Sequence, residues 1–98
     1  MANSIKTAQF LLESRLGDAA YGSPQACFDL GIAYSCGTGG VDIDLIEAHK
    51  WFNLAALAGS EQGQQMRAEI AEEMTAREIA EAQRQARAWI VAASPRAA

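Results

Sequence analysis

The chain offers few side chains for chemistry: a single histidine, His49, and two cysteines, Cys27 and Cys36. One histidine rules out a histidine-rich metal site, and any pairing of a serine or cysteine nucleophile with histidine must use His49. We expect His49, which stands next to Trp51-Phe52 in the sequence, to face solvent. The two cysteines lie nine residues apart, on opposite faces of one helix. We therefore expect two buried, reduced thiols and no disulfide.

Two other patterns resemble ligand sites without completing them. Asp42, Asp44 and Glu47 are acidic residues at short spacing, but the third ligand, the central glycine and the distal glutamate of an EF-hand calcium loop are missing. We interpret these acids as turn and capping residues. The glycine-rich run at 37–40 follows a helix and precedes no Lys-Ser/Thr pair, so it is not a phosphate-binding loop. The sequence predicts no metal, no cofactor and no catalytic residue.

Length, composition and charge indicate one small acidic domain. The 98 residues are 50% hydrophobic and 20% charged, which excludes wholesale disorder. With 8 Lys plus Arg against 12 Asp plus Glu, the net charge is −4, so we expect binding to neither nucleic acid nor membrane. We find no uncharged stretch long enough to cross a bilayer and no secretory signal. A cytoplasmic location is the resulting expectation.

Apolar periodicity and capping signals predict five helices and no strand. The predicted helical segments are about 5–21, 24–36, 44–58, 61–74 and 76–93. Their predicted N-caps are Ser4, Ser23, Asp44, Ser60 and Thr75. Two of these caps have an acidic partner three residues on, Glu47 and Glu78, in the form of a capping box. We expect Trp51 to be buried between the second and fourth helices.

The chain also repeats itself with an offset of 37 residues. Gly22-Ser23 aligns with Gly59-Ser60, and Ala19 aligns with Ala56. The pairs Gln25 with Gln62 and Ala26 with Gly63 keep the same offset. Helix–turn–helix units that recur at such a spacing are typical of an α-solenoid.

Residues inside this unit follow a known pattern. They are Ala26, Leu30-Gly31, Tyr34, Gly37, Gly39, Val41, Asp44, Ala48, Trp51-Phe52, Ala55-Ala56 and Gly59. This pattern resembles the Sel-1-like repeat, a relative of the tetratricopeptide repeat, over one full repeat from about Ser23 to Gly59. The residues that follow, Met74-Thr75 and 78–84, resemble the terminal repeat and closing helix of many bacterial members. One departure is an extra residue, Gly40, in the loop.

The resemblance implies an all-α, right-handed solenoid segment of about five antiparallel helices. A single Sel-1-like repeat domain would fill residues 1–98, with an N-terminal helix as a degenerate half repeat at 1–22, the full repeat at 23–59, a closing helix pair at 60–93 and a tail at 94–98. A cysteine-rich branch of the family, associated with β-lactam hydrolysis, joins two helices by a disulfide. Because Ala19 stands at the partner position of Cys27, this association does not carry over.

The resemblance also implies a non-catalytic protein–protein interaction module, or adaptor, that binds a protein or peptide on its concave face. The outward positions of the second and fourth helices would line that face: Gln25, Phe28, Asp29, Ile32, Gln62, Gln65, Glu69 and Glu73. In the opposing interpretation, Phe28 and Ile32 pack against the first helix and the other positions form an ordinary solvated face.

Two alternatives stay open. The chain could be a small hydrolase or ligand-binding protein that uses His49 with one of the cysteines, and a deep pocket containing these residues would favour that function. Separately, Phe10 and Leu11 lie on a sparsely charged part of the first helix. This apolar patch predicts either a weak homodimer through the first helix or a monomer that uses the patch to recognise another protein.

Overall fold

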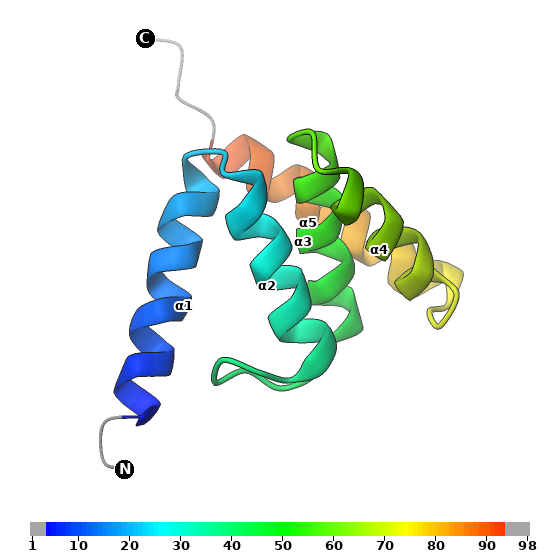
Figure 1. The fold of residues 1–98 in the computed structure, drawn as a ribbon. Coiled ribbons are helices and arrows are strands. Elements are labelled where there is room, and N and C mark those ends of the chain that lie inside the picture. Colours follow the sequence, from blue (N-terminus) through cyan, green and yellow to red (C-terminus); the bar gives the residue numbers. More distant parts are fainter. Residues whose placement is uncertain (1–3, 94–98) are drawn as a thin grey trace, which may run out of the picture.

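The computed structural model describes residues 4–93 and consists of five α-helices joined by short turns and one longer loop (Figure 1). The helices are α1 (Ser4–Ala20), α2 (Pro24–Cys36), α3 (Leu45–Leu57), α4 (Glu61–Ala71) and α5 (Ala76–Ala93). Within residues 4–93 there is no strand, so the all-α class is confirmed. The predicted tail, 94–98, lies outside the described residues.

Side-chain caps start α2, α4 and α5 where the sequence predicts them, whereas Ser4, the predicted cap of α1, is the first residue of that helix. Ser23 Oγ accepts a hydrogen bond from the Ala26 N–H at 3.1 Å, and Ser60 Oγ accepts one from the Gly63 N–H at 2.9 Å. The capping box at α5 is complete, because Thr75 and Glu78 each accept a hydrogen bond from the other's backbone N–H. These bonds satisfy N–H groups that have no partner within the helix.

The capping box expected at α3 is only half formed. Asp44 Oδ1 accepts from the Glu47 N–H at 3.1 Å, as predicted. The Glu47 carboxylate does not return to Asp44; it accepts from Lys50 Nζ at 2.9 Å and from Trp51 Nε1 at 3.0 Å. The indole N–H needs an acceptor when the ring is buried, and Glu47 supplies it one helical turn away.

The fourth helix is shorter than predicted. It ends at Ala71 instead of near Met74, because the next three N–H groups bond to carbonyls three residues back. These tighter bonds run from Glu72 to Glu69, from Glu73 to Ile70 and from Met74 to Ala71.

The two turns that the sequence aligns at an offset of 37 have the same backbone geometry. The Gly22 N–H donates to the Ala19 carbonyl at 2.9 Å, and the Gly59 N–H donates to the Ala56 carbonyl at 3.0 Å. The following serines bond in the same way, Ser23 to Asp18 and Ser60 to Ala55. Both glycines have positive φ, 88° and 105°, so the turns need residues without a Cβ. The α1–α2 and α3–α4 corners are therefore equivalent parts of a repeat.

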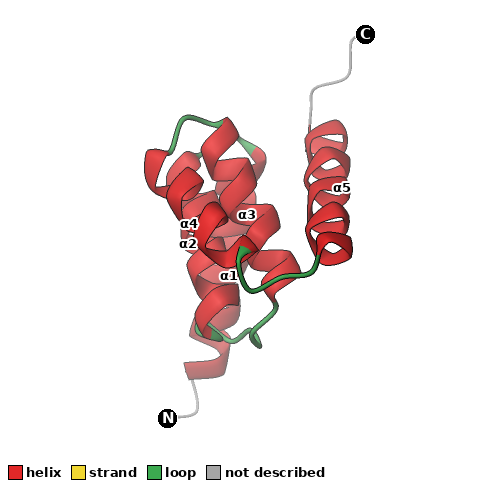
Figure 2. Cartoon of the chain, turned by 90° about the vertical axis from the view of Figure 1, so that its right-hand side faces the viewer, coloured by secondary structure: helices red, strands yellow, loops and turns green. Residues whose placement is uncertain are grey.

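Helix α3 is the centre of the fold: α2, α4 and α5 all pack against it, and α1 packs against α2. The helices of the predicted closing pair therefore do not pair along their lengths. Helix α4 lies beside α3, whereas α5 turns back and crosses α3 on another side (Figures 1 and 2). None of the five helices has the length and hydropathy needed to traverse a lipid bilayer.

The path of α5 determines where Trp51 is buried. Trp51 is enclosed, as expected, but its cluster contains residues of α1, α2, α3 and α5, including Cys27, Leu30 and Ala86. Its ring meets Trp89 edge-on with centroids 4.8 Å apart. The predicted position between the second and fourth helices is therefore wrong. A separate cluster of Ala48, Phe52 and Ile70 joins α3 to α4.

Candidate protein-interaction surface

Seven of the eight residues predicted for the binding face lie on α2 and α4, and Glu73 lies just past the end of α4, but they do not form one continuous site. The polar residues Gln25, Gln62 and Gln65 are exposed, and Gln25 Nε2 donates to Asp29 Oδ1 at 2.9 Å on the surface of α2. The remaining four divide into a half-buried apolar pair on α2 and an acidic pair at the C-terminal end of α4.

The apolar pair, Phe28 and Ile32, supports the packing between helices. Both side chains are half-buried and pack against the cluster that joins α3 to α4. The Phe28 ring is tilted against Phe52, with centroids 5.6 Å apart, and Phe28 also contacts the cluster around Trp51. In the opposing interpretation, Phe28 and Ile32 pack against the first helix. For Ile32 the structure shows packing against the α3–α4 cluster instead.

The acidic pair lines a groove that we call the acidic groove. Its lining residues are Ser35, Ile43, Leu45, Met66, Glu69, Ile70, Glu72 and Glu73, and its volume is ≈ 610 Å³. Of these only Glu69 and Glu73 were predicted. The other six come from the end of α2, from the α2–α3 loop, from α3 and from α4. One sequence signal was available. Ile43 is a large apolar residue between two aspartates in a predicted loop, where most side chains are polar.

Backbone contacts hold the loop part of the acidic groove in place. The Asp44 N–H donates to the Tyr34 carbonyl at 2.9 Å, which ties the loop to α2. Beside it, the Ile43 side chain lies directly over Gly37, where an added Cβ would come within 2.9 Å of Ile43 Cγ1. Ile43 is nevertheless 63% exposed. The loop thus presents a fixed apolar side chain at the edge of the groove.

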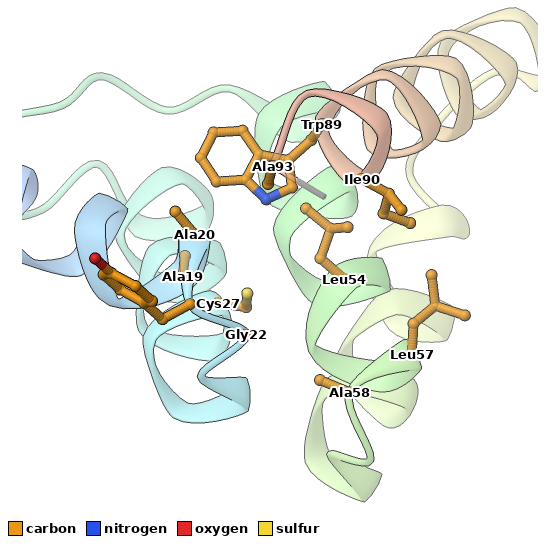
Figure 3. Close-up of a pocket in the computed structure, with 11 residues that line it drawn as sticks. Ala19, Ala20, Gly22, Cys27, Leu54, Leu57, Ala58, Trp89, Ile90 and Ala93 are labelled. Carbon is orange, nitrogen blue, oxygen red and sulfur yellow. The ribbon is translucent and has the colours of Figure 1, made fainter. Parts of the chain in front are cut away.

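A second, apolar cleft lies at the other end of α3 (Figure 3). It is bounded by the α1–α2 turn and by the ends of α3 and α5, and its volume is ≈ 350 Å³. Its lining consists of Ala19, Ala20, Tyr21, Gly22, Cys27, Leu54, Leu57, Ala58, Trp89, Ile90 and Ala93. It contains no acid, amine or imidazole. The cleft can accommodate apolar groups but holds no pair of residues for acid–base catalysis.

His49 is buried, so the expectation that it faces solvent is wrong. The residue is 2% exposed, and its Nδ1 atom is buried without a hydrogen-bond partner. Because α3 packs against three helices, few of its side chains reach the surface. Burial lowers the pKa of His49, and the positive charge of Arg67 lowers it further. The imidazole is therefore neutral in the folded chain near neutral pH.

We expect the stability of the chain to fall on acidification because of His49. The unfolded chain takes up a proton as the pH drops below about 6.5, whereas folded His49, with its lower pKa, resists protonation. The free energy of unfolding should then fall by up to about 1.4 kcal/mol per pH unit, with no contribution from His49 above that range. Urea unfolding at a series of pH values measures this slope. His49→Gln should lose this part of the slope, and an unchanged slope would refute the assignment.

The two cysteines differ in exposure, and only one matches the prediction. Both are free, as expected; Cys27 is buried in the Trp51 cluster, whereas Cys36 is exposed at the end of α2. The expectation of two buried thiols is wrong for Cys36. It is the last residue of a helix that ends at a left-handed Gly37, so its side chain lies beyond the packed part of α2. Burial raises the pKa of the Cys27 thiol, which keeps it protonated.

A thiol reagent should therefore distinguish the two cysteines. We expect Cys36 to react in the native state at the rate of an unhindered thiol, while Cys27 reacts only in denaturant. Mass spectrometry of the chain labelled with and without urea gives both rates, and the Cys36→Ser variant isolates Cys27. Rapid native labelling of Cys27 in that variant would contradict the packing described here.

The geometry does not assemble the residues of the hydrolase alternative. The apolar cleft includes Cys27 but not His49, and the acidic groove includes neither cysteine nor His49. Among the described residues, no three His, Cys, Asp or Glu side chains are grouped so that they could hold a metal ion. Neither lining brings a cysteine together with His49.

Comparison with protein families identifies the central hairpin. The model of the Sel1 repeat matches residues 24–60, from the first residue of α2 to the N-cap of α4. Comparison with curated proteins and with solved structures gave no match. Sel1 repeats are helical, solenoid-type units that generally mediate protein–protein interactions and are typically non-catalytic. With this match, and equivalent corners at both of its ends, residues 24–60 form one Sel1 repeat.

Proposed function

We propose that the chain is a non-catalytic interaction module, an adaptor that binds a protein or peptide on the surface formed by α2, α4 and the α2–α3 loop. The observation that carries the proposal is the acidic groove, which combines an apolar floor with acidic side chains at its edge. Such a mixture of apolar and polar groups is typical of surfaces that bind proteins.

The exposed polar residues next to the groove support the same surface. Gln62 and Gln65 lie on α4, the helix that supplies Glu69 to the groove and that Glu73 follows. Amide side chains both donate and accept hydrogen bonds, so they suit the backbone of a bound segment. Asp29 and Gln25 on α2 would form the far edge of this surface.

Site-specific photocrosslinking tests the proposal. A photoreactive phenylalanine derivative at Gln65 should give a defined adduct with one or a few proteins in an extract of the native cell. The same group at Arg87, an exposed residue of α5, serves as the matched control and should give none of these adducts. Equal adducts at both positions, or none at Gln65, would refute the assigned surface. Hydrolysis of a substrate that is lost in His49→Gln would instead support the enzyme alternative.

We further propose that a second copy of the chain binds to the exposed face of α1. Phe10 is 68% exposed and Leu11 is 45% exposed. At the offset of 37 residues Leu11 corresponds to Ala48, which is completely buried. On helix α1 this position is therefore exposed, whereas on the equivalent helix α3 it is packed against other helices. In a twofold dimer, the second copy would bury the exposed face of α1.

Sedimentation equilibrium over a wide concentration range should show a mass that rises from one chain towards two. Leu11→Glu should keep the chain monomeric, because the charge would be buried in the interface without a partner. Leu57→Glu, which adds the same charge to an exposed position on α3, is the control and should still dimerise. A single-chain mass for the unmodified protein at every concentration would refute the dimer.

A further inference from the structure

The charges and contacts of the acidic groove point to the chemistry of its partner. We propose that the groove binds a cationic amphipathic segment of a partner protein, with an apolar side chain on the groove floor and Lys or Arg side chains on the carboxylates of Glu69, Glu72 and Glu73. This inference rests on the proposed interaction function and specifies the partner.

The three carboxylates lie at positions where their negative charge destabilises the fold of the isolated chain. Glu69 is in the last turn of α4 and Glu72 is its C-cap residue, with Glu73 next in sequence. The C-terminal end of a helix carries partial negative charge and its last carbonyls have no partner within the helix, so acidic side chains there are unfavourable. No basic residue in the last turn offsets them.

Within the described part of the chain, no salt bridge joins a cation to these carboxylates. In residues 4–93, the salt bridges join Glu47 to Lys50 and Glu81 to Arg84. The arginine of α4, Arg67, donates instead to Asn53 Oδ1 at 2.6 Å. Local charge arrangements that disfavour the fold are expected where function requires them. A cation from a partner would relieve the repulsion among the three carboxylates.

The floor of the groove suits an apolar side chain. Leu45, Met66 and Ile70 line the groove, and the exposed Ile43 lines its edge. Met66 has an unbranched, flexible side chain that can adapt to different partners, while the loop contacts described above fix Ile43 before binding. A preformed anchor lowers the entropy that is lost on association.

The negative potential also selects the class of partner. Phosphate groups of nucleic acids and anionic lipids would be repelled by three adjacent carboxylates. A protein segment that carries both Lys or Arg and an apolar residue matches both parts of the groove. Charge complementarity of this kind raises the association rate and excludes acidic competitors.

Fluorescence anisotropy with a designed peptide tests the inference. The probe is a fluorescein-labelled amphipathic helix of Lys and Leu, and the matched probe has Glu in place of every Lys. Three forms of the full chain are compared: unmodified, E69Q/E72Q/E73Q in the groove, and E13Q/D18N/E61Q outside it. Both triple variants change the net charge equally. The groove variant should fold normally, since it removes repulsion at the end of α4, and circular dichroism checks this.

We expect the Lys probe to bind the unmodified chain and the E13Q/D18N/E61Q control alike. It should bind the groove variant about tenfold more weakly, as three partly screened charge contacts imply. Ile43→Ser should weaken binding as well, while the Glu probe should not bind. Raising NaCl from about 0.05 M to about 0.5 M should reduce affinity for the unmodified chain more than for the groove variant.

Equal binding of the Lys probe by the two triple variants would overturn the inference, because the attraction would then depend only on net charge. Absence of binding to the unmodified chain at low salt would overturn it too. Either result leaves the interaction function intact if crosslinking at Gln65 still identifies a protein. Failure of that crosslinking refutes the proposed function whatever the probe does.

Discussion

Replacement of Trp51 by alanine should remove a large part of the free energy of unfolding. The indole is 2% exposed, packs edge-on against Trp89 with centroids 4.8 Å apart, and donates its N–H to Glu47. Loss of a buried aromatic ring costs about 3–5 kcal/mol, and a small domain has about 5–15 kcal/mol in total. Because the ring contacts residues from several helices, the loss affects α2, α3 and α5 together.

Thermal and urea unfolding, followed by circular dichroism, measure this effect. Leu57→Ala provides a control on the same helix, because Leu57 is 65% exposed and its truncation removes little buried surface. We expect the control to unfold within about 1 kcal/mol of the unmodified chain. A Trp51→Ala variant as stable as the control would show that α5 does not cover α3 as described.

The second large effect is expected from the smallest possible change, Gly31→Ala. A Cβ at this position would lie 2.5 Å from two ring carbons of Phe52, which is completely buried. Alanine normally favours a helix over glycine by about 1 kcal/mol, but overpacking of a closed core costs about 1–3 kcal/mol. Since Phe52 is completely buried and interiors are closely packed, we expect a net loss of stability and a wider separation of α2 and α3.

Gly17→Ala is the matched control for this prediction. Gly17 is also inside a helix, but an added Cβ there meets nothing within 4 Å. The helix preference then acts alone, and the midpoint of urea unfolding should rise, by about 0.5–1 kcal/mol in free energy. Opposite signs for the two substitutions would confirm that α2 and α3 are in closest contact at Gly31. A gain of stability in both would contradict it.

Local features of the fold could be predicted from the sequence because they depend on neighbouring residues. Ser23 and Ser60 accept hydrogen bonds from N–H groups three residues on, and Gly22 and Gly59 adopt positive φ. Both properties follow from the residue type at a turn. The helix order and the repeat at the centre of the chain were predictable for the same reason.

The path of α5 could not be predicted, because it depends on contacts between distant segments. A capping box at Thr75 predicts where α5 begins but not which helix it covers. The return of α5 to α3 gives Trp51 its neighbour Trp89, and the packing of three helices around α3 leaves little of its surface exposed, His49 included. A pattern of apolar residues along one helix indicates a buried face without identifying its partner.

The acidic groove was predicted only in part for a similar reason. Glu69 and Glu73 could be placed on the outward side of the fourth helix from their spacing. Ile43 joins them only because the loop is tied to Tyr34 and lies over Gly37. Such a juxtaposition of loop and helix has no signature in the spacing of residues.

The path of α5 also sets the direction in which the repeat array can grow. In a regular stack, the helix after α4 would lie along α4 as α3 lies along α2, and further units would follow in the same direction. Helix α5 instead packs against α3 (Figure 2), so it does not extend the stack beyond α4. Units duplicated after α4 would have to displace α5 before they could stack in register. Only the α1 side, where Phe10 and Leu11 are exposed, can accept an added unit without rearrangement of the core, which makes the array extensible from one end alone.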